Sequence, residues 1–325
     1  MPTATIAPVF AVLSVTFPFF ALVLCGYVAA HRGALPLSAI GGLNAFVLFF
    51  ALPCMLFRLG AHTPLAQLLD PVAAAVYAGS AALLVVVLVA CTLGRWGWND
   101  AAFGALVTVF PNSGFMGLPL LVALLGQDSA APVMLTLALD MVVTTSVCIA
   151  LSRLGLGQGS AGRALRLALR GVLLNPLPWA IALGAVASAW QLRLPGPLEQ
   201  TVAMLAAAAS PVALFTMGAV LARSQMSQAE QVAPRHYVPL ALTKLLLHPL
   251  LVWLACQVVL ALGAALSRPT VVALVLTAAL PSASNVAVLA ERFGAHGGRV
   301  ARVILVSTVL SFFSFSAAVA LLTGL

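Results

Sequence analysis

Two proline-containing strings interrupt long apolar segments of this chain, and both carry small polar side chains. Residues 110–119 read FPNSGFMGLP, and residues 280–285 read LPSASN. Asparagine and serine side chains can donate and accept hydrogen bonds without carrying a charge. The candidate ligand-binding residues of the two strings are Pro111, Asn112, Ser113, Gly114, Pro281, Ser282, Ser284 and Asn285.

The backbone around the two prolines predicts an anion-binding site. A proline inside a helix removes a backbone donor and clashes with the preceding turn, so we expect each helix to open before Pro111 and before Pro281. The helix that restarts after each break would present free N–H groups and the positive end of its dipole. Two such ends that face one another would bind an anion without a buried cation. The alternative is a pair of proline kinks that neighbouring helices tolerate.

Three ionisable side chains within apolar segments are further candidates. Asp140 lies in the middle of one segment, and Lys244 lies near the end of another. Because a charge at membrane depth is costly, the two are candidates for a proton-coupling pair, with a purely structural ion pair as the alternative. Arg58 lies at the end of a third segment, where it could meet the carboxylate of a ligand or extend to lipid headgroups.

The composition places these residues in a membrane. Apolar residues make up 63% of the chain and charged residues 7%, whereas soluble domains carry about 25% charged residues. The net charge of +8 does not indicate nucleic-acid binding, because the sequence has no basic helix with interleaved aromatic residues. The five cysteines lack the spacing of a metal site or a disulfide framework, and no enzyme motif such as HExxH or GxSxG occurs. We therefore expect an integral membrane protein that is not an enzyme and holds no metal or organic cofactor.

Ten stretches are apolar and long enough to form membrane-spanning helices, which need about 20 residues each. They are residues 8–30, 37–59, 70–93, 100–125, 130–152, 171–190, 198–222, 236–263, 270–292 and 300–323. The longest basic connection, residues 153–170, follows the fifth stretch.

The arginines predict the orientation in the membrane. Eleven lie in or beside the connections that follow odd-numbered stretches: Arg32, Arg95, Arg153, Arg163, Arg166, Arg170, Arg223, Arg235, Arg292, Arg299 and Arg302. Only Arg58, Arg193 and Arg268 lie at the opposite ends. Because basic residues concentrate in cytoplasmic loops, this distribution predicts that both termini lie outside.

Five stretches on each side of the basic connection suggest two inverted repeats, residues 1–152 and 171–325. An odd number of spans in each half forces the halves into opposite orientations. The string PCMLFRLG at 53–60 aligns with PVALFTMG at 211–218, so proline, leucine, phenylalanine and glycine match in register. The fourth and ninth stretches then correspond through Pro111 and Pro281. Paired interruptions of this kind mark the substrate site of secondary transporters.

Three strings in this chain resemble the auxin efflux carrier family, which holds plant PIN-type carriers and bacterial organic-acid permeases. They are LNAFV with FALP within 43–53, PNS with MGLPLL within 111–121, and AALP at 278–281. The string at 111–121 is fairly specific to the family. The chain lacks the long hydrophilic loop of many plant carriers, and only residues 153–170 stand in its place. It is therefore most similar to the short bacterial forms, which puts transport of auxin itself in doubt.

The resemblance implies an all-α membrane fold like that of bile-acid/sodium symporters and sodium–proton antiporters. Ten helices would form two inverted repeats. The first, second, sixth and seventh helices would form a scaffold, often the dimer-forming part, and the third to fifth and eighth to tenth a transport domain. The fourth and ninth helices would cross at Pro111 and Pro281, and substrate would bind there and move by an elevator-like slide. The resemblance also implies a bacterial inner-membrane protein that forms a homodimer.

These observations predict a secondary transporter of small organic anions such as malonate or malate. The residues of the two strings would hold the carboxylates, Lys244 or Arg58 could supply a cation, and Asp140 could carry a coupling proton. Carbonyl groups at the breaks could instead hold Na⁺ as the coupling ion. One alternative is an exporter of amino acids or of hydrophobic acids such as auxin-like compounds. Another is a membrane ligand sensor that does not transport.

Overall fold

The computed structural model describes residues 6–156, 160–226 and 232–323 of the protein. Within these ranges the regular elements are helices, apart from one isolated β-bridge. The α-helices are α1 (Ile6–His31), α2 (Ala39–Phe46), α3 (Leu52–His62), α4 (Leu65–Leu68), α5 (Pro71–Val109), α6 (Leu118–Leu125), α7 (Ala130–Leu139), α8 (Thr145–Ser152), α9 (Ser160–Leu174), α10 (Pro176–Ala189), α11 (Gly196–Met226), α12 (Val238–Leu242), α13 (His248–Ala261), α14 (Arg268–Ala279), α15 (Asn285–Arg292) and α16 (Gly297–Thr323). The π-helical turns are η1 (Val47–Ala51), η2 (Ser113–Gly117), η4 (Asp140–Thr144) and η7 (Thr243–Leu247), and the 3-10 turns are η3 (Gln127–Ser129), η5 (Leu154–Leu156) and η6 (Pro234–His236).

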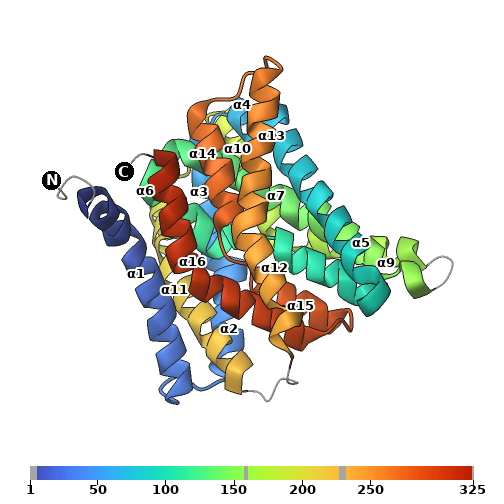
Figure 1. The fold of residues 1–325 in the computed structure, drawn as a ribbon. Helices are drawn as coiled ribbons and strands as arrows, with labels where there is room; N and C mark the ends of the chain where they lie inside the picture. Colours follow the sequence, from blue (N-terminus) through green and yellow to red (C-terminus); the bar gives the residue numbers. More distant parts are fainter. Residues whose placement is uncertain (1–5, 157–159, 227–231, 324–325) are drawn as a thin grey trace.

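The helices have the length and composition of a multi-pass membrane protein. Seven helical stretches in the described ranges are long and apolar enough to cross a membrane. Three shorter apolar helices occur beside them, at Ser113–Leu125, Pro176–Ala189 and Arg268–Ala279. The start of α1 and the end of α16 lie at the same end of the molecule (Figure 1).

The element α5 consists of two helical segments that meet at Gly97, which lies between the stretches 70–93 and 100–125 that the sequence predicted as separate spans. Its backbone stays helical on both sides of Gly97, whose φ of 72° places the residue in the left-handed region and kinks the helix there. Glycine tolerates this conformation because it has no Cβ. The helix begins at a well-formed cap, in which Asp70 Oδ1 accepts hydrogen bonds from Val72 N (2.9 Å) and Ala73 N (3.0 Å). The second half of α5 is almost entirely buried and leads to the first proline string.

The connection expected at 153–170 contains a helix. Helix α9 packs against α8 and lies at the edge of the molecule (Figure 1). Its described side chains include three exposed arginines, Arg163, Arg166 and Arg170, spaced three and four residues apart. Residues at this spacing share one face of a helix. The segment was predicted to be a connection because it is rich in arginine. The spacing of its apolar residues is nevertheless that of an amphipathic helix.

The helices pack in two groups. Helix α1 packs along α11, and α3 packs against α10 and α11. Glycine permits the close approach of α1 and α11: a Cβ on Gly26 would lie 1.8 Å from Phe215 O, and one on Gly218 would lie 1.8 Å from Val23 O. In the other group, α5 contacts α8 and α13, while α14 contacts α7, α13 and α16. The two proline strings belong to this second group.

Candidate functional site

The first proline string ends one helix and starts another inside the protein. Helix α5 ends at Val109, and Phe110 takes an extended conformation with ψ 102° before Pro111. The chain resumes as the π-helical turn η2, whose first residue is Ser113, and continues into α6. The Asn112 and Ser113 side chains are buried, with 3% and 0% of their surfaces exposed. The helix therefore opens before Pro111, as the sequence predicted, and the break lies in the protein interior.

The second proline string has the same design. Helix α14 ends at Ala279, and Leu280 is extended with ψ 156° immediately before Pro281. Helix α15 begins at Asn285. Pro281 and Ser282 are buried. The predicted opening of both helices at their prolines is confirmed.

The two breaks lie against each other and are joined by their own backbone groups. Asn112 N donates to Pro281 O at 2.8 Å, and Ala283 N donates to Phe110 O at 3.0 Å. These bonds form an antiparallel bridge between Pro111 and Ser282. Because lipid offers no water to backbone groups, each break supplies the partners that the other has lost. The bridge fixes the two strings as one structural unit.

A serine from a third helix completes this joint. Ser282 N donates to Ser307 Oγ at 3.1 Å, and Ser307 Oγ donates to Ile304 O at 3.1 Å. This part of α16 carries a stripe of small hydroxyl residues, and the pattern alone indicates helix packing. The stripe consists of Ser307, Thr308, Ser311 and Ser314. The role of Ser307 as an acceptor for the second break could not be predicted, because it depends on the distance between α16 and Ser282.

A cavity of about 450 Å³ opens beside the joint. Five of the eight predicted string residues line it: Pro111, Asn112, Gly114, Ser284 and Asn285. Ser113, Pro281 and Ser282 belong to the joint but are not in the cavity wall. Asn44 and Asn175 also line the cavity, so four of the five asparagines of the chain converge on it.

Polar atoms of the joint and of the cavity wall have spare hydrogen-bonding capacity. Asn112 Nδ2 lies 2.8 Å from the Met217 sulfur, a weak acceptor. Ser113 Oγ, Ser282 Oγ and Asn285 Oδ1 are buried and lack a hydrogen-bond partner in the described ranges. Unpaired buried polar atoms are rare in native proteins and call for an explanation such as a ligand or water. Of these residues, Asn112 and Asn285 line the cavity, where a ligand that donates and accepts hydrogen bonds would pair with their amides.

Asp140 and Lys244 are both fully buried but are held by different partners. Tyr77 Oη donates to Asp140 Oδ2 at 2.6 Å, and Thr144 Oγ1 donates to Asp140 Oδ1 at 3.0 Å. Lys244 Nζ donates to Ala278 O at 3.0 Å, in the last turn of α14.

The two charges are connected indirectly, through a tyrosine and a histidine. Lys244 Nζ lies 3.0 Å from His248 Nδ1. The ring centroids of Tyr77 and His248 are 6.0 Å apart. In the described part of the chain, Asp140 and Lys244 form no direct ion pair. A Tyr77–His248 contact between them could not be read from the sequence.

The cavity and the buried charges are neighbours along one helix. Thr145 lines the cavity, and its Oγ1 donates to the backbone carbonyl of Asp140 at 2.7 Å. Asp140 also begins the π-helical turn η4, and Lys244 lies within η7. π-helical turns are rare in proteins, and those that do occur are often found at functional sites. Arg58, by contrast, lies outside the cavity wall, and its Nε is buried without a partner among the described residues.

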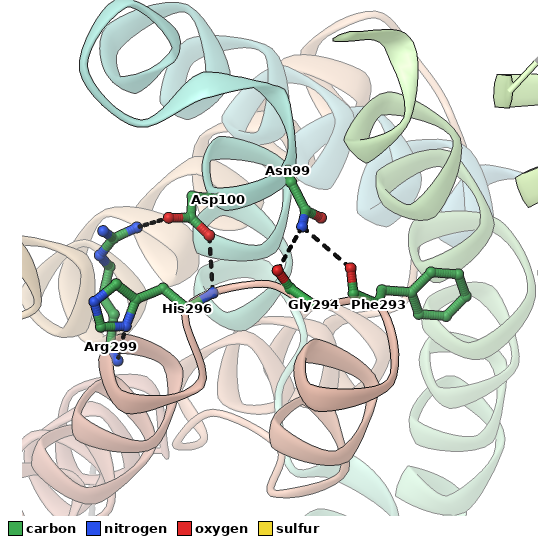
Figure 2. A network of polar contacts seen from close by, with 6 residues as sticks. All are labelled: Asn99, Asp100, Phe293, Gly294, His296 and Arg299. Carbon is green, nitrogen blue, oxygen red and sulfur yellow. Dashed lines mark hydrogen bonds and ion pairs between the residues drawn. The ribbon is translucent and has the colours of Figure 1, made fainter. Parts of the chain in front are cut away.

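A polar network fixes one rim of the cavity (Figure 2). Asn99 Nδ2 donates to Phe293 O at 3.1 Å and to Gly294 O at 2.9 Å, which satisfies carbonyls at the end of α15. Asp100 accepts from His296 N at 2.8 Å and pairs with Arg299 at 3.4 Å. The network ties the second half of α5 to the turn between α15 and α16. Phe293 is also a cavity-lining residue, so this turn belongs to the cavity rim.

Comparison with known proteins places this architecture in a family. The family described as "Membrane transport protein" matches residues 11–319. A protein of Rhizobium meliloti (strain 1021) named "Putative malonate transporter" is 31% identical over 318 residues, which cover 97% of this chain and 94% of that protein. "Uncharacterized transporter YfdV" of Escherichia coli (strain K12) is 26% identical, with 91% of this chain and 92% of the relative covered. An "Uncharacterized transporter" of Methanothermobacter thermautotrophicus is 28% identical, with 90% and 92% covered.

The match spans both proline strings, the cavity residues and the buried charges. The family and these relatives are transporters and not enzymes, in agreement with the sequence. The chain therefore belongs to the auxin efflux carrier family of membrane transport proteins.

Proposed function

We propose that this protein is a secondary active transporter of small organic anions, represented by malonate or malate. The observation that carries the proposal is the joint of the two proline breaks, which opens into a cavity lined by Asn112, Ser284 and Asn285. Each helix that restarts after a break begins at the joint, so the positive end of its dipole lies there and favours an anion, although most of the N–H groups at the joint already have backbone or serine partners. Amide and hydroxyl side chains add donors without a buried charge. The name of the Rhizobium meliloti relative supports a short dicarboxylate as the first substrate to test.

The proposed architecture is ten spans in two inverted repeats, residues 1–152 and 171–325. Gly97 would divide α5 into two spans, and the shorter apolar helices would complete the set. We propose that the helices α1, α2, α3, α10 and α11, which pack together, form a scaffold and that the helices α5 to α8 and α12 to α16 form a moving transport domain. The protein would act as a homodimer in a bacterial inner membrane, with both termini outside. Substrate would cross by an elevator-like slide of the transport domain.

We propose that the buried charges couple this movement to a proton or sodium gradient. Asp140 is close to the cavity through Thr145, and Lys244 contacts α14 one turn before the second break. A change in the charge of either residue would therefore alter its contacts with the helices that form the site. Backbone carbonyls at the breaks offer an alternative site for Na⁺. Arg58 could meet the substrate in an outward-facing state.

A second candidate is an exporter of hydrophobic acids or amino acids, because much of the cavity wall is apolar. Phe49, Phe110 and Phe115 line it together with leucine, isoleucine and valine side chains. An aromatic wall would favour a substrate with an apolar body and one carboxylate. A ligand sensor is less well supported, because the family is one of transporters.

Uptake of labelled malonate into proteoliposomes tests the proposal. We expect uptake driven by an imposed proton or sodium gradient and competition by unlabelled short dicarboxylates. Asn112→Ala and Asn285→Ala should abolish uptake while the proteins still assemble in the membrane. Normal uptake by either variant would refute the site assignment. If aromatic or branched acids compete and short dicarboxylates do not, the second candidate is correct.

A further inference from the structure

The cavity contains two guanidinium groups that no prediction from the sequence assigned to the site. Arg223 lies in the last turn of α11, and Arg292 lies in the last turn of α15. Both line the same cavity as Asn112 and Asn285. Both side chains are exposed, and within the described ranges neither takes part in a hydrogen bond or an ion pair. They are therefore free to bind a ligand.

The two ends of the cavity differ in charge. The wall at the proline joint carries neutral amides and hydroxyls, from Asn112, Ser284 and Asn285. The ionisable residues of the described wall are Arg223, Arg292 and Glu291, all at the ends of their helices. Two cations and one anion leave a net charge of +1 at this rim. The guanidinium fork matches the geometry of a carboxylate, with which it forms paired hydrogen bonds.

The end of α15, which carries Arg292, is tied to α5 and to the end of α8 by hydrogen bonds to its following turn. The last carbonyls of α15 and its following turn, those of Phe293 and Gly294, accept hydrogen bonds from Asn99 (Figure 2). Arg153 Nη2 also donates to Phe293 O at 2.7 Å. Arg223 approaches the cavity from α11, which belongs to the other group of helices. A ligand held by both arginines would therefore contact both groups at once.

We propose that Arg223 and Arg292 form a subsite for the second carboxylate of a dicarboxylate whose first carboxylate lies at the proline joint. This inference rests on the proposed function and specifies its substrate class. A dicarboxylate satisfies both ends of the cavity, whereas a monocarboxylate leaves the two guanidinium groups unpaired. The protein then prefers dicarboxylates to monocarboxylates of the same size.

Binding of labelled malonate to purified protein, competed by unlabelled malonate or monomethyl malonate, tests the subsite. The two competitors are similar in size but differ by one negative charge. We expect Arg223→Gln and Arg292→Gln each to weaken malonate binding about tenfold, the effect of losing a charge-assisted hydrogen bond. The binding of monomethyl malonate should change little. The double variant should lose less than the product of the two single effects, since both residues bind one carboxylate.

Two controls separate the subsite from a general effect of surface charge. Arg32→Gln with Arg95→Gln removes two exposed arginines that do not line the cavity, and this variant should bind malonate as the wild type does. Glu291→Gln removes the negative charge of the rim and should strengthen malonate binding. Size-exclusion profiles of all variants check that the fold is retained.

The outcomes distinguish this inference from the proposed function. Malonate binding that is unchanged in the double Arg223/Arg292 variant would overturn the subsite and leave the transporter proposal intact. Equal losses for malonate and monomethyl malonate, or an equal loss in the Arg32/Arg95 control, would also overturn it. Failure of the wild-type protein to bind or transport any carboxylate would refute the proposed function itself.

Discussion

Replacement of Ser307 by alanine should disrupt the joint between the two proline breaks more than an equivalent change one turn away. Ser307 Oγ accepts a hydrogen bond from Ser282 N and donates one to Ile304 O. Ser311, also buried on α16, donates to Thr308 O in the same way but accepts no hydrogen bond from another helix in the described ranges. Ser311→Ala therefore serves as a matched control. The difference between the two variants isolates the hydrogen bond to Ser282 N.

The expected size of this difference follows from the burial of Ser282. A buried donor left unpaired costs about 1–3 kcal/mol. Measured hydrogen bonds between helices in membranes average about 0.6 kcal/mol and reach about 1.7 kcal/mol. We expect Ser307→Ala to lower the free energy of unfolding by about 1–2 kcal/mol more than Ser311→Ala, which is roughly a factor of five to thirty in the folded-to-unfolded ratio. Ser307→Thr retains the hydroxyl and should recover most of the loss.

Thermal unfolding in detergent and malonate uptake in proteoliposomes would measure these effects in parallel. The midpoint of unfolding should fall for both alanine variants and fall further for Ser307→Ala. Uptake should fall only for Ser307→Ala, because only that residue supports the substrate site. Equal midpoints and equal uptake for the two variants would refute the assignment of Ser307 to the joint. The stripe of small residues on α16 would then serve helix packing alone.

Three other residues allow simpler tests. Asp140→Asn should abolish gradient-driven uptake but preserve malonate exchange, because an amide does not carry the proposed proton; gradient-driven uptake at the wild-type rate would contradict its coupling role. Gly218→Ala should destabilise the protein by about 1–3 kcal/mol in thermal unfolding, since its Cβ would lie 1.8 Å from Val23 O, whereas Gly41→Ala, with nothing within 4 Å, should be tolerated. Asp100→Asn should cost less than about 1 kcal/mol in the same assay, because its ion pair is partly exposed; a loss as large as that of Gly218→Ala would show that the network in Figure 2 is a major source of stability.

The proline strings were predictable because their chemistry is local. A proline opens a helix whatever surrounds it, so residues 110–119 and 280–285 indicated both breaks and most of the polar site. The apolar stretches likewise predicted an all-helical membrane protein. Their boundaries were not specified by the sequence: the break within α5 is confined to Gly97, and α9 is helical within a basic segment.

The remainder of the site depends on distances between elements that no sequence pattern specifies. Asn44 is a single polar residue in an apolar segment, and this pattern by itself indicates no more than a hydrogen bond between helices. Arg223 and Arg292 fitted the distribution of arginines that sets membrane orientation, and this role accounted for them fully. Only the packing of α11 and α15 around one cavity brings these residues to the substrate site. The partners of Asp140 and Lys244 depended on packing in the same way.

The distribution of charge around the cavity suits a carrier that must return empty. A fixed cation at membrane depth costs about 2.5–3.5 kcal/mol on insertion scales, and the carrier would bear that cost in every unloaded step. Neutral donors such as Asn112 and Asn285, with helix dipoles, attract an anion but leave no net charge behind when it departs. The arginines lie instead at the rim, in the last turns of α11 and α15, where their side chains are exposed. In the proposed mechanism, the neutral donors lie at the joint and the arginines lie at the rim. The site can then bind a dianion tightly when loaded, and the empty transport domain can still move across the membrane.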